Sequence, residues 1–164
     1  MRSLELNREY ALRHLFVTVV FIGLGCWFGY DGFVRYPAAD AAALYESIEG
    51  SAPQPGFDLA KFKAQKVASQ RLFACFLLVL GAVVGIRLLR SSRFRFSWDD
   101  SGFSVGGERH SFGEVALCDS SLWKKKGILK LRLKPKGTVA LDSWHHCGVR
   151  DFVAVLGEKT GIVA

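Results

Sequence analysis

LFVTVVFIGLGCWFGY (Leu15–Tyr30) and LFACFLLVLGAVVGI (Leu72–Ile86) are two sequence runs that contain no charged residue. As helices they would extend about 24 and 22 Å, slightly less than the roughly 30 Å hydrocarbon core of a bilayer. Basic side chains beside the runs, such as Arg13 and Arg87, are long enough to reach the interface and close that gap. We therefore predict two transmembrane helices, over residues 15–30 and 72–89, joined by a polar loop.

The charge distribution predicts the orientation of these helices. The chain of 164 residues carries a net charge of +7; residues 1–30 contribute +1 (three Arg, two Glu), and residues 31–71 contribute zero (five basic, five acidic). The region from Arg87 onward has fourteen basic and eight acidic residues, a net charge of +6. Lys and Arg close to the ends of a span favour the cytoplasmic side. We therefore expect a multi-pass protein of the inner (plasma) membrane with both termini in the cytoplasm.

Local signals assign the polar segments around the two spans. We expect residues 1–14 to form a short cytoplasmic arm and residues 31–71 to form an extracytoplasmic helical loop. The first loop helix, Pro37–Glu49, ends at a Gly/Pro-rich breaker, and Asp58 caps a second helix that continues into the second span. A cleaved signal peptide is the alternative for the N-terminus, but the small residues Ala41–Ala43 lie far beyond the first run, whereas cleavage sites normally follow the apolar region closely.

The tail, residues 90–164, changes to the period of β-strands. Ile128–Lys134 illustrates this, because leucines at positions 129, 131 and 133 alternate with basic residues. The other expected strands are Arg93–Trp98, Phe103–Val105, Arg109–Phe112, Val115–Asp119 and Thr138–Leu141. We predict about six short antiparallel strands in this region.

The end of the tail changes again, from the period of strands to that of a helix. Apolar residues recur there at positions i, i+3, i+4 and i+7, namely Val149, Phe152, Val153 and Leu156. We expect Gly157 to end this amphipathic helix. The predicted fold class is therefore a membrane α-helical hairpin plus a small, mainly β domain closed by a C-terminal helix.

The strands, turns and closing helix resemble the bacterial pleckstrin-homology-like (PH-like) domains of small membrane proteins, which often follow a two-helix anchor. The similarity covers residues 90–157 and rests on patterning and turn spacing. It is carried by the segments Phe96–Val105, Phe112–Val115, Lys126–Leu133, Val139–Asp142 and Val149–Leu156. The resemblance implies a cytoplasmic domain with a binding or scaffolding role and without a defined ligand.

Basic residues gather beside the second span and in one loop of the tail. The two groups are Arg87, Arg90, Arg93 and Arg95, and then Trp123, Lys124, Lys125 and Lys126. Each basic residue near an anionic leaflet contributes about 1 kcal/mol of binding free energy. We predict contact with anionic lipid head groups; the alternative is that these charges set the membrane topology and keep the domain soluble. Nucleic-acid binding is not expected, because the aromatic residues are needed for the core.

A specific head-group site is implied only by the resemblance. Eukaryotic relatives hold phosphoinositide head groups with a Lys followed by Lys-x-Arg. Lys126, Lys130 and Arg132 match this pattern loosely, but on a later strand than the family uses.

Both spans contain a GxxxG motif, which allows helices to approach closely: Gly25 and Gly29 in the first, Gly81 and Gly85 in the second. Counted by helical rise from the cytoplasmic ends, the two motifs lie at different depths. We therefore expect Gly23 to be the crossing point opposite Gly81. One GxxxG face would then be free for a second copy or another membrane protein; ordinary glycine enrichment in membrane helices is the alternative.

The sequence predicts no catalytic, cofactor or metal site. The contiguous His145–Cys147 segment lacks the usual spacing of zinc ligands, and Asp99–Asp100 belongs to an Asp-Asp-Ser-Gly turn. Cys26 and Cys75 lie at similar depths in the two spans and can pair only if their helix faces oppose each other.

These observations favour a non-enzymatic membrane protein that presents a PH-like binding or scaffold domain at the membrane surface. The alternative is an accessory or assembly subunit of a larger membrane complex, docked through the glycine faces.

Overall fold

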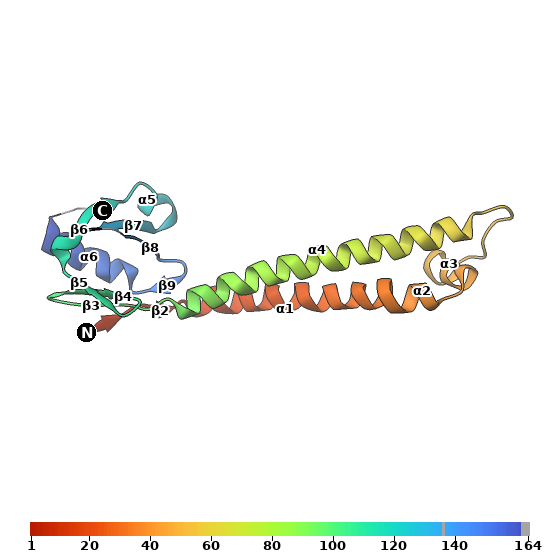
Figure 1. Ribbon diagram of the computed structural model, residues 1–164, viewed down its shortest axis with the longest axis horizontal. Helices are drawn as coiled ribbons and strands as arrows, with labels where there is room; N and C mark the ends of the chain where they lie inside the picture. Colours follow the sequence, from red (N-terminus) through yellow and green to blue (C-terminus); the bar gives the residue numbers. More distant parts are fainter. Residues whose placement is uncertain (136, 162–164) are drawn as a thin grey trace. The chain divides into compact units, whose positions relative to one another are not determined.

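The computed structural model describes residues 1–135 and 137–161 and divides into two compact units (Figure 1). The helical hairpin comprises His14–Arg87, and the β domain comprises Met1–Arg13 together with Leu88–Ala164. Lys136, which falls in a predicted turn, and residues 162–164 lie outside the described residues. The prediction of two long apolar helices and a mainly β region with a C-terminal helix is confirmed.

Both apolar runs lie within helices that are longer than the runs themselves. The elements are α1 (Arg8–Tyr30), the π-helical turn η1 (Asp31–Arg35), α2 (Tyr36–Ala38), α3 (Ala41–Glu49) and α4 (Leu59–Arg93). As predicted, Asp58 caps α4, accepting a hydrogen bond from the Lys61 backbone N–H at 2.9 Å. The single helix predicted over Pro37–Glu49 is wrong, because Asp40 caps a separate helix by accepting from the backbone N–H groups of Ala42 and Ala43.

Small residues line the seam between α1 and α4, which run side by side in opposite directions (Figure 1). The contacting pairs are Thr18 with Gly85, Ile22 with Gly81, Gly25 with Leu78, and Gly29 with Ala74. The spacing along each helix alternates between three and four residues, which is the period of a coiled-coil seam. At Gly81 an added Cβ would lie 2.9 Å from the Ile22 Cγ1 atom, so the helices are close enough there to require glycine.

The predicted role of Gly23 is therefore wrong. An added Cβ on Gly23 would meet no atom within 4 Å, whereas Gly81 packs against Ile22 and Phe21. Both GxxxG motifs face the opposite helix within one chain, each against larger side chains or alanine rather than against glycine. The prediction that one GxxxG face stays free is therefore wrong, because a glycine of one helix can pack against a larger residue of the other and does not need a glycine opposite it.

The loop-side end of the seam is polar. The carboxylate of Asp31 is buried and lies 3.4 Å from the Arg35 guanidinium nitrogen Nη1. The π-helical turn η1 leaves the Gly32 carbonyl available, and Arg71 Nε donates a hydrogen bond to it at 3.0 Å. The carbonyl oxygen of the buried Gln70 amide finds no partner among the described residues.

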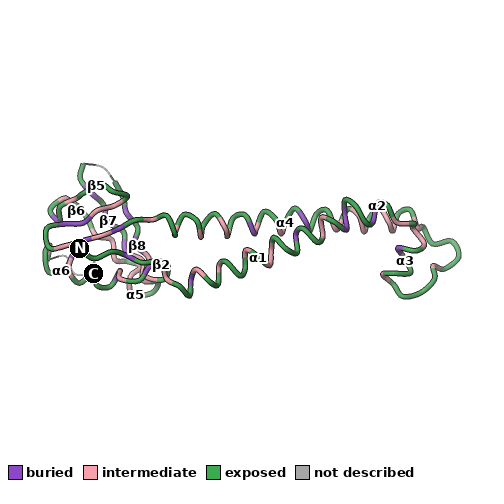
Figure 2. The backbone as a smooth tube through the Cα atoms, turned by 90° about the horizontal axis from the view of Figure 1, so that it is seen from below, coloured by how far each residue is buried: buried purple, intermediate pink, exposed green. Residues whose placement is uncertain are grey.

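Most of α1 and α4 is exposed or half-buried (Figure 2), and within the two apolar runs the buried residues are small whereas many large apolar ones are exposed. Gly25, Ala74 and Gly81 are buried, whereas Phe16 and Leu72 are each 70% exposed. Two helices are long and apolar enough to cross a membrane, and only 6% and 11% of their most apolar stretches are buried. Cys26 and Cys75 are both exposed and free.

The seam generates a stability prediction for the hairpin. Both Gly81→Ala and Gly23→Ala gain about 1 kcal/mol of helix propensity, but Gly81→Ala adds a methyl group into a filled space. We expect Gly81→Ala to be less stable than Gly23→Ala by about 1–3 kcal/mol. Titration of the detergent-solubilised chain with SDS, followed by helix content, measures the difference; equal stability of the two variants would contradict the seam.

Three antiparallel sheets build the β domain among the described residues. The first sheet has the order β1 (Arg2–Ser3), β3 (Phe96–Asp99), β4 (Gly102–Val105) and β5 (Glu108–His110). The second contains β6 (Val115–Asp119), β7 (Ile128–Leu133) and β8 (Thr138–Asp142), and the third pairs β2 (Glu5–Leu6) with β9 (His146–Cys147). The remaining elements are η2 (Phe112–Glu114), α5 (Trp123–Lys126) and α6 (Val149–Thr160).

The core of the β domain matches the predicted alternation. Leu129, Leu131 and Leu133 of β7 point inward, and Phe152 of α6 packs edge-on against Phe96 with ring centroids 4.7 Å apart. The predicted end of the last helix is wrong. The helix continues through Gly157 to Thr160, and Gly161 ends it with a φ of 68°.

The N-terminal segment is part of the β domain and not merely a polar arm, which corrects the prediction for residues 1–14. Arg2 pairs with Trp98 in the sheet register, and the Leu4 backbone N–H donates to the Phe96 carbonyl at 2.9 Å. The Leu4 side chain is 9% exposed and belongs to the core cluster. The sequence signal is weak here because each strand is only two residues long.

We expect Leu4→Ala to destabilise the β domain by about 2 kcal/mol, because the substitution leaves a cavity against the core. Thermal unfolding followed by near-ultraviolet circular dichroism of the full chain measures this. Glu5→Ala is the matched control, since the Glu5 side chain is exposed. If both variants unfold like the wild type, the N-terminal strands do not contribute to the domain.

Candidate functional site

An open pocket of about 850 Å³ brings together one of the two predicted groups of basic residues. Its wall includes Trp123, Lys124, Lys125 and Lys126 of α5, Trp144 of the β8–β9 loop, and Arg150 of α6. We call this site the basic pocket. Sequence analysis identified the α5 group but missed Trp144 and Arg150.

Backbone contacts hold the two loops of the pocket together. Gly127 ends α5 with a φ of 65°, and its N–H donates to the Trp123 carbonyl at 2.8 Å. The Gly127 carbonyl accepts from the Ser143 backbone N–H at 3.0 Å. A Cβ at Gly127 would collide with the Ser143 side chain, so glycine is required twice, for the φ angle and for this close approach. The lysines and Trp144 are therefore presented from a joined surface.

The helix α6 supplies the third wall. Arg150, Val153 and Ala154 follow at i, i+3 and i+4 and so share one face of the helix. The same amphipathic pattern that predicted the buried face of α6 also places Arg150 beside it. What the sequence did not indicate is that this face lies next to α5.

The cations of the basic pocket have no carboxylate partner. Lys124, Lys125, Lys126 and Arg150 are exposed, and within residues 1–135 and 137–161 none of them forms an ion pair. Four unpaired positive charges around one depression attract anions and repel cations.

Trp144 links the basic pocket to the first helix. Its ring is 42% exposed, its backbone N–H donates to Asp142 Oδ1 at 2.8 Å, and the Arg13 guanidinium carbon lies 5.6 Å from its ring centroid. Arg13 also pairs with Glu9 one turn earlier in α1. Arg13 is the last residue of the N-terminal part of the β domain and stands two residues before Leu15 in the sequence.

The other predicted basic residues do not line the basic pocket. Arg90 and Arg93 lie in the last turn of α4, where positive charge complements the helix dipole, and Arg95 follows before β3. Arg87 belongs to the helical hairpin. Of the three residues implied by the eukaryotic head-group pattern, Lys126 lines the pocket, whereas Lys130 and Arg132 lie on the exposed face of β7 and do not line it.

A mainly acidic depression of about 510 Å³, to which Arg2 also contributes, borders α6 beside the basic pocket. It is lined by Asp151 and Glu158 of α6 together with Asp99 and Asp100. Ala154 lines both depressions, so α6 separates an acidic region from the basic pocket.

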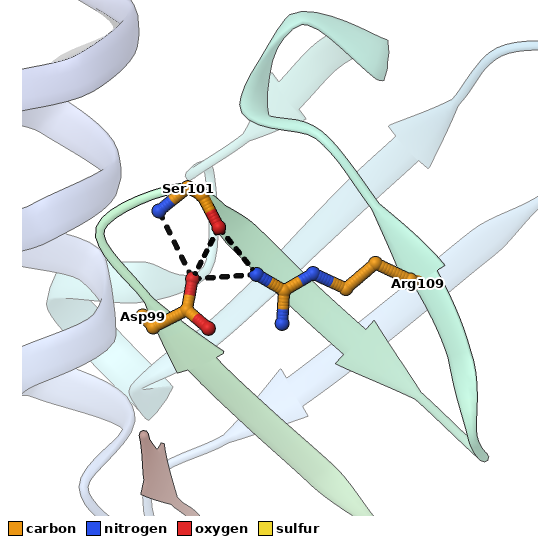
Figure 3. Close-up of polar contacts among 3 residues, drawn as sticks. All are labelled: Asp99, Ser101 and Arg109. Carbon is orange, nitrogen blue, oxygen red and sulfur yellow. Dashed lines mark hydrogen bonds and ion pairs between the residues drawn. The ribbon is translucent and has the colours of Figure 1, made fainter.

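The Asp99–Asp100 turn is stabilised by charge pairing (Figure 3). Arg109 Nη2 donates to Asp99 Oδ1 and to the Ser101 hydroxyl oxygen, both at 2.6 Å, and the Ser101 hydroxyl donates to the same Asp99 oxygen at 2.8 Å. The hydrogen bond from Arg109, followed by those from Ser101, holds the pKa of Asp99 well below its ordinary value of 3.8. Asp99 is thus engaged in the turn, as turn chemistry predicts.

The cysteines and histidines of the β domain take part in separate contacts. Among the described residues no group of three or more His, Cys, Asp or Glu is placed to hold a metal ion. Burial raises the pKa of the Cys118 thiol, and His110 lies 2.9 Å from Glu114 and lowers the pKa of that carboxyl. Buried His146 instead contacts the Ser91 carbonyl through Nε2 at 3.1 Å.

No family model matches the chain, and neither a curated protein nor a solved structure matches it significantly.

The Asp99 turn generates a pH prediction. A carboxyl with a lowered pKa in the folded state stabilises that state above its unfolded pKa, and this contribution is lost as the pH falls through the folded pKa. We expect Asp99→Asn to be less stable than the wild type near neutral pH, with a difference that shrinks below pH 3.8. Thermal unfolding as a function of pH measures this, with Asp100→Asn as the exposed control; a pH-independent difference would contradict the ion pair.

Proposed function

We propose that this protein is a non-enzymatic integral membrane protein. Its two long helices anchor a cytoplasmic, PH-like β domain, which presents the basic pocket to anionic lipid head groups of the inner (plasma) membrane and acts there as a binding or scaffolding module. The proposal rests on the contact between Arg13 and Trp144, because it links the pocket wall to the residue that enters the first apolar run.

Membrane insertion is supported by the inverted packing of the hairpin. In water, large apolar side chains such as Phe16 and Leu72 would be buried and small ones left outside, because burial of apolar area is favourable. The hairpin has the opposite arrangement, with glycine and alanine at the seam. Lipid tails solvate the large side chains, and the small residues allow close helix packing.

The same-side placement of both termini is supported by the composition of the β domain. β1 pairs with β3 and β2 pairs with β9, so the N-terminal segment and the tail form one folded unit. One folded unit occupies one compartment, and the Lys and Arg near the spans favour the cytoplasm for it. This arrangement also disfavours removal of the N-terminal segment, since Leu4 is part of the core.

The PH-like assignment is supported by three antiparallel sheets, the third of only two short strands, and by a C-terminal helix whose Val149, Phe152 and Leu156 are buried in the core. Such domains are typical of binding and not of catalysis. The alternative role, an accessory subunit of a membrane complex, needs a docking surface other than the GxxxG faces, because both are used within the hairpin.

The proposed lipid contact predicts selective protection of α5. We expect acylation of Lys124, Lys125 and Lys126 to be about fivefold slower when the full chain is in nanodiscs with phosphatidylglycerol than in discs of phosphatidylcholine alone, the factor given by about 1 kcal/mol per residue. Added salt should remove the protection, because it screens the charges. Mass spectrometry of the modified lysines measures the rates.

Lys130 and Lys134 are the internal controls, because they are exposed and do not line the basic pocket. Reporter fusions at Ser51 and at the C-terminus establish the compartments in parallel. Equal rates in both kinds of disc would refute the lipid contact, and a C-terminal reporter active outside the cytoplasm would refute the topology.

A further inference from the structure

We propose that the basic pocket is a discrete site for one phosphate monoester group, supplied by a lipid head group or by a small soluble phosphate ester. This inference rests on the proposed function and makes it specific, because a discrete site differs from the diffuse attraction of any basic surface to an anionic membrane.

The charges of the pocket match a dianion. A phosphate monoester carries about −1.5 to −2 charges at neutral pH, whereas a phosphodiester carries one. Lys124, Lys125, Lys126 and Arg150 supply four positive charges that no described carboxylate neutralises. A single diester would leave most of this charge uncompensated, so the dianion is the better electrostatic match.

The shape of the pocket favours a bound group over surface contact. Its volume of about 850 Å³ falls within the range of small-molecule sites, which is about 300–1,000 Å³. The cations come from two separate elements, α5 and α6, and line the same depression. Arg150 offers a planar fork that fits two phosphate oxygens, and the lysines add point charges.

The two tryptophans define what the phosphate is attached to. Trp123 packs against the core, and Trp144 is partly exposed beside Arg13. Indole rings provide apolar area with one polar N–H, which suits the glycerol or sugar-like carbon skeleton next to a phosphate. The contact of Gly127 with Ser143 fixes the spacing of α5 and the Trp144 loop before any ligand binds, which lowers the entropic cost of binding.

The test uses the full chain in nanodiscs of phosphatidylcholine, titrated with glycerol 3-phosphate and, separately, with inorganic phosphate. Tryptophan fluorescence reports binding at Trp123 and Trp144, in a Trp27→Phe background that removes the exposed indole of the hairpin. A second arm compares discs that contain phosphatidic acid, a monoester, with discs that contain the diester phosphatidylglycerol. Saturation with the soluble ester identifies a free ligand, and a response confined to phosphatidic acid identifies the lipid.

Two triple variants with the same loss of charge separate the site from diffuse charge. Lys124, Lys125 and Lys126→Gln should weaken binding at least about tenfold, because charge-assisted hydrogen bonds are removed. Lys130, Arg132 and Lys134→Gln, of which the first two lie on the exposed face of β7 and the third is exposed directly after it, should change it less than about twofold. Thermal unfolding of both variants confirms that each is folded.

Absence of saturation in both arms, or equal losses in the two triple variants, would overturn the discrete site. An equal response to phosphatidic acid and phosphatidylglycerol would overturn the choice of a monoester. None of these outcomes affects the reporter fusions or the lysine protection, so failure of the site is distinguishable from failure of the proposed function.

Discussion

The segment from Ser143 to Cys147 joins the parts of the β domain on which the rest of the structure depends. Its His145 carbonyl accepts from the Asn7 backbone N–H at 2.9 Å, and the Tyr10 ring contacts the His145 ring at a tilt of 42° with centroids 4.4 Å apart, so the start of α1 is held against it. His146 contacts the Ser91 carbonyl, which holds the end of α4. The basic pocket takes Trp144 from the same five residues. The segment therefore contacts the start of α1 and the end of α4 through short-range interactions.

The hairpin and the β domain differ in the size of the side chains that they bury. In the β domain, Phe103, Phe152 and Leu131 are fully buried, and the stabilisation comes from apolar area removed from water. Within the two apolar runs of the hairpin the buried positions are Gly25, Ala74 and Gly81, which bury little area but allow backbones to approach. In lipid, burial of large apolar side chains brings little stabilisation, because lipid tails solvate them as well as the protein interior does, whereas close packing of small residues remains favourable. The change of packing rule along the chain is therefore the physical argument for a membrane boundary.

Local signals predicted the elements whose residues interact within a few positions. The uncharged runs, the Asp58 cap and the alternation of Ile128–Lys134 all belong to this class. The sequence did not indicate β1 and β2, because two-residue strands have no period and their partners lie more than ninety positions away. The prediction that Gly23 packs opposite Gly81 was wrong for a similar reason. Helical rise gives the position of a residue along the helix axis, but the contact of Gly81 with Ile22 also depends on how each helix is rotated about its axis. Trp144 and Arg150 joined the candidate site only through tertiary packing.

Residues of the helix α6 line both the acidic depression and the basic pocket, so the charge of the β domain surface changes sign across this helix. Arg150 faces the basic pocket, while Asp151 and Glu158 face the acidic depression, and Ala154 lies between the two. In the proposed contact, an anionic surface would attract the first side and repel the second, and so would orient the domain. Two adjacent residues of one helix, Arg150 and Asp151, carry this division, since neighbours along a helix point about 100° apart. Substitutions that reverse the sign of either residue would therefore change the preferred orientation of the domain without altering its core.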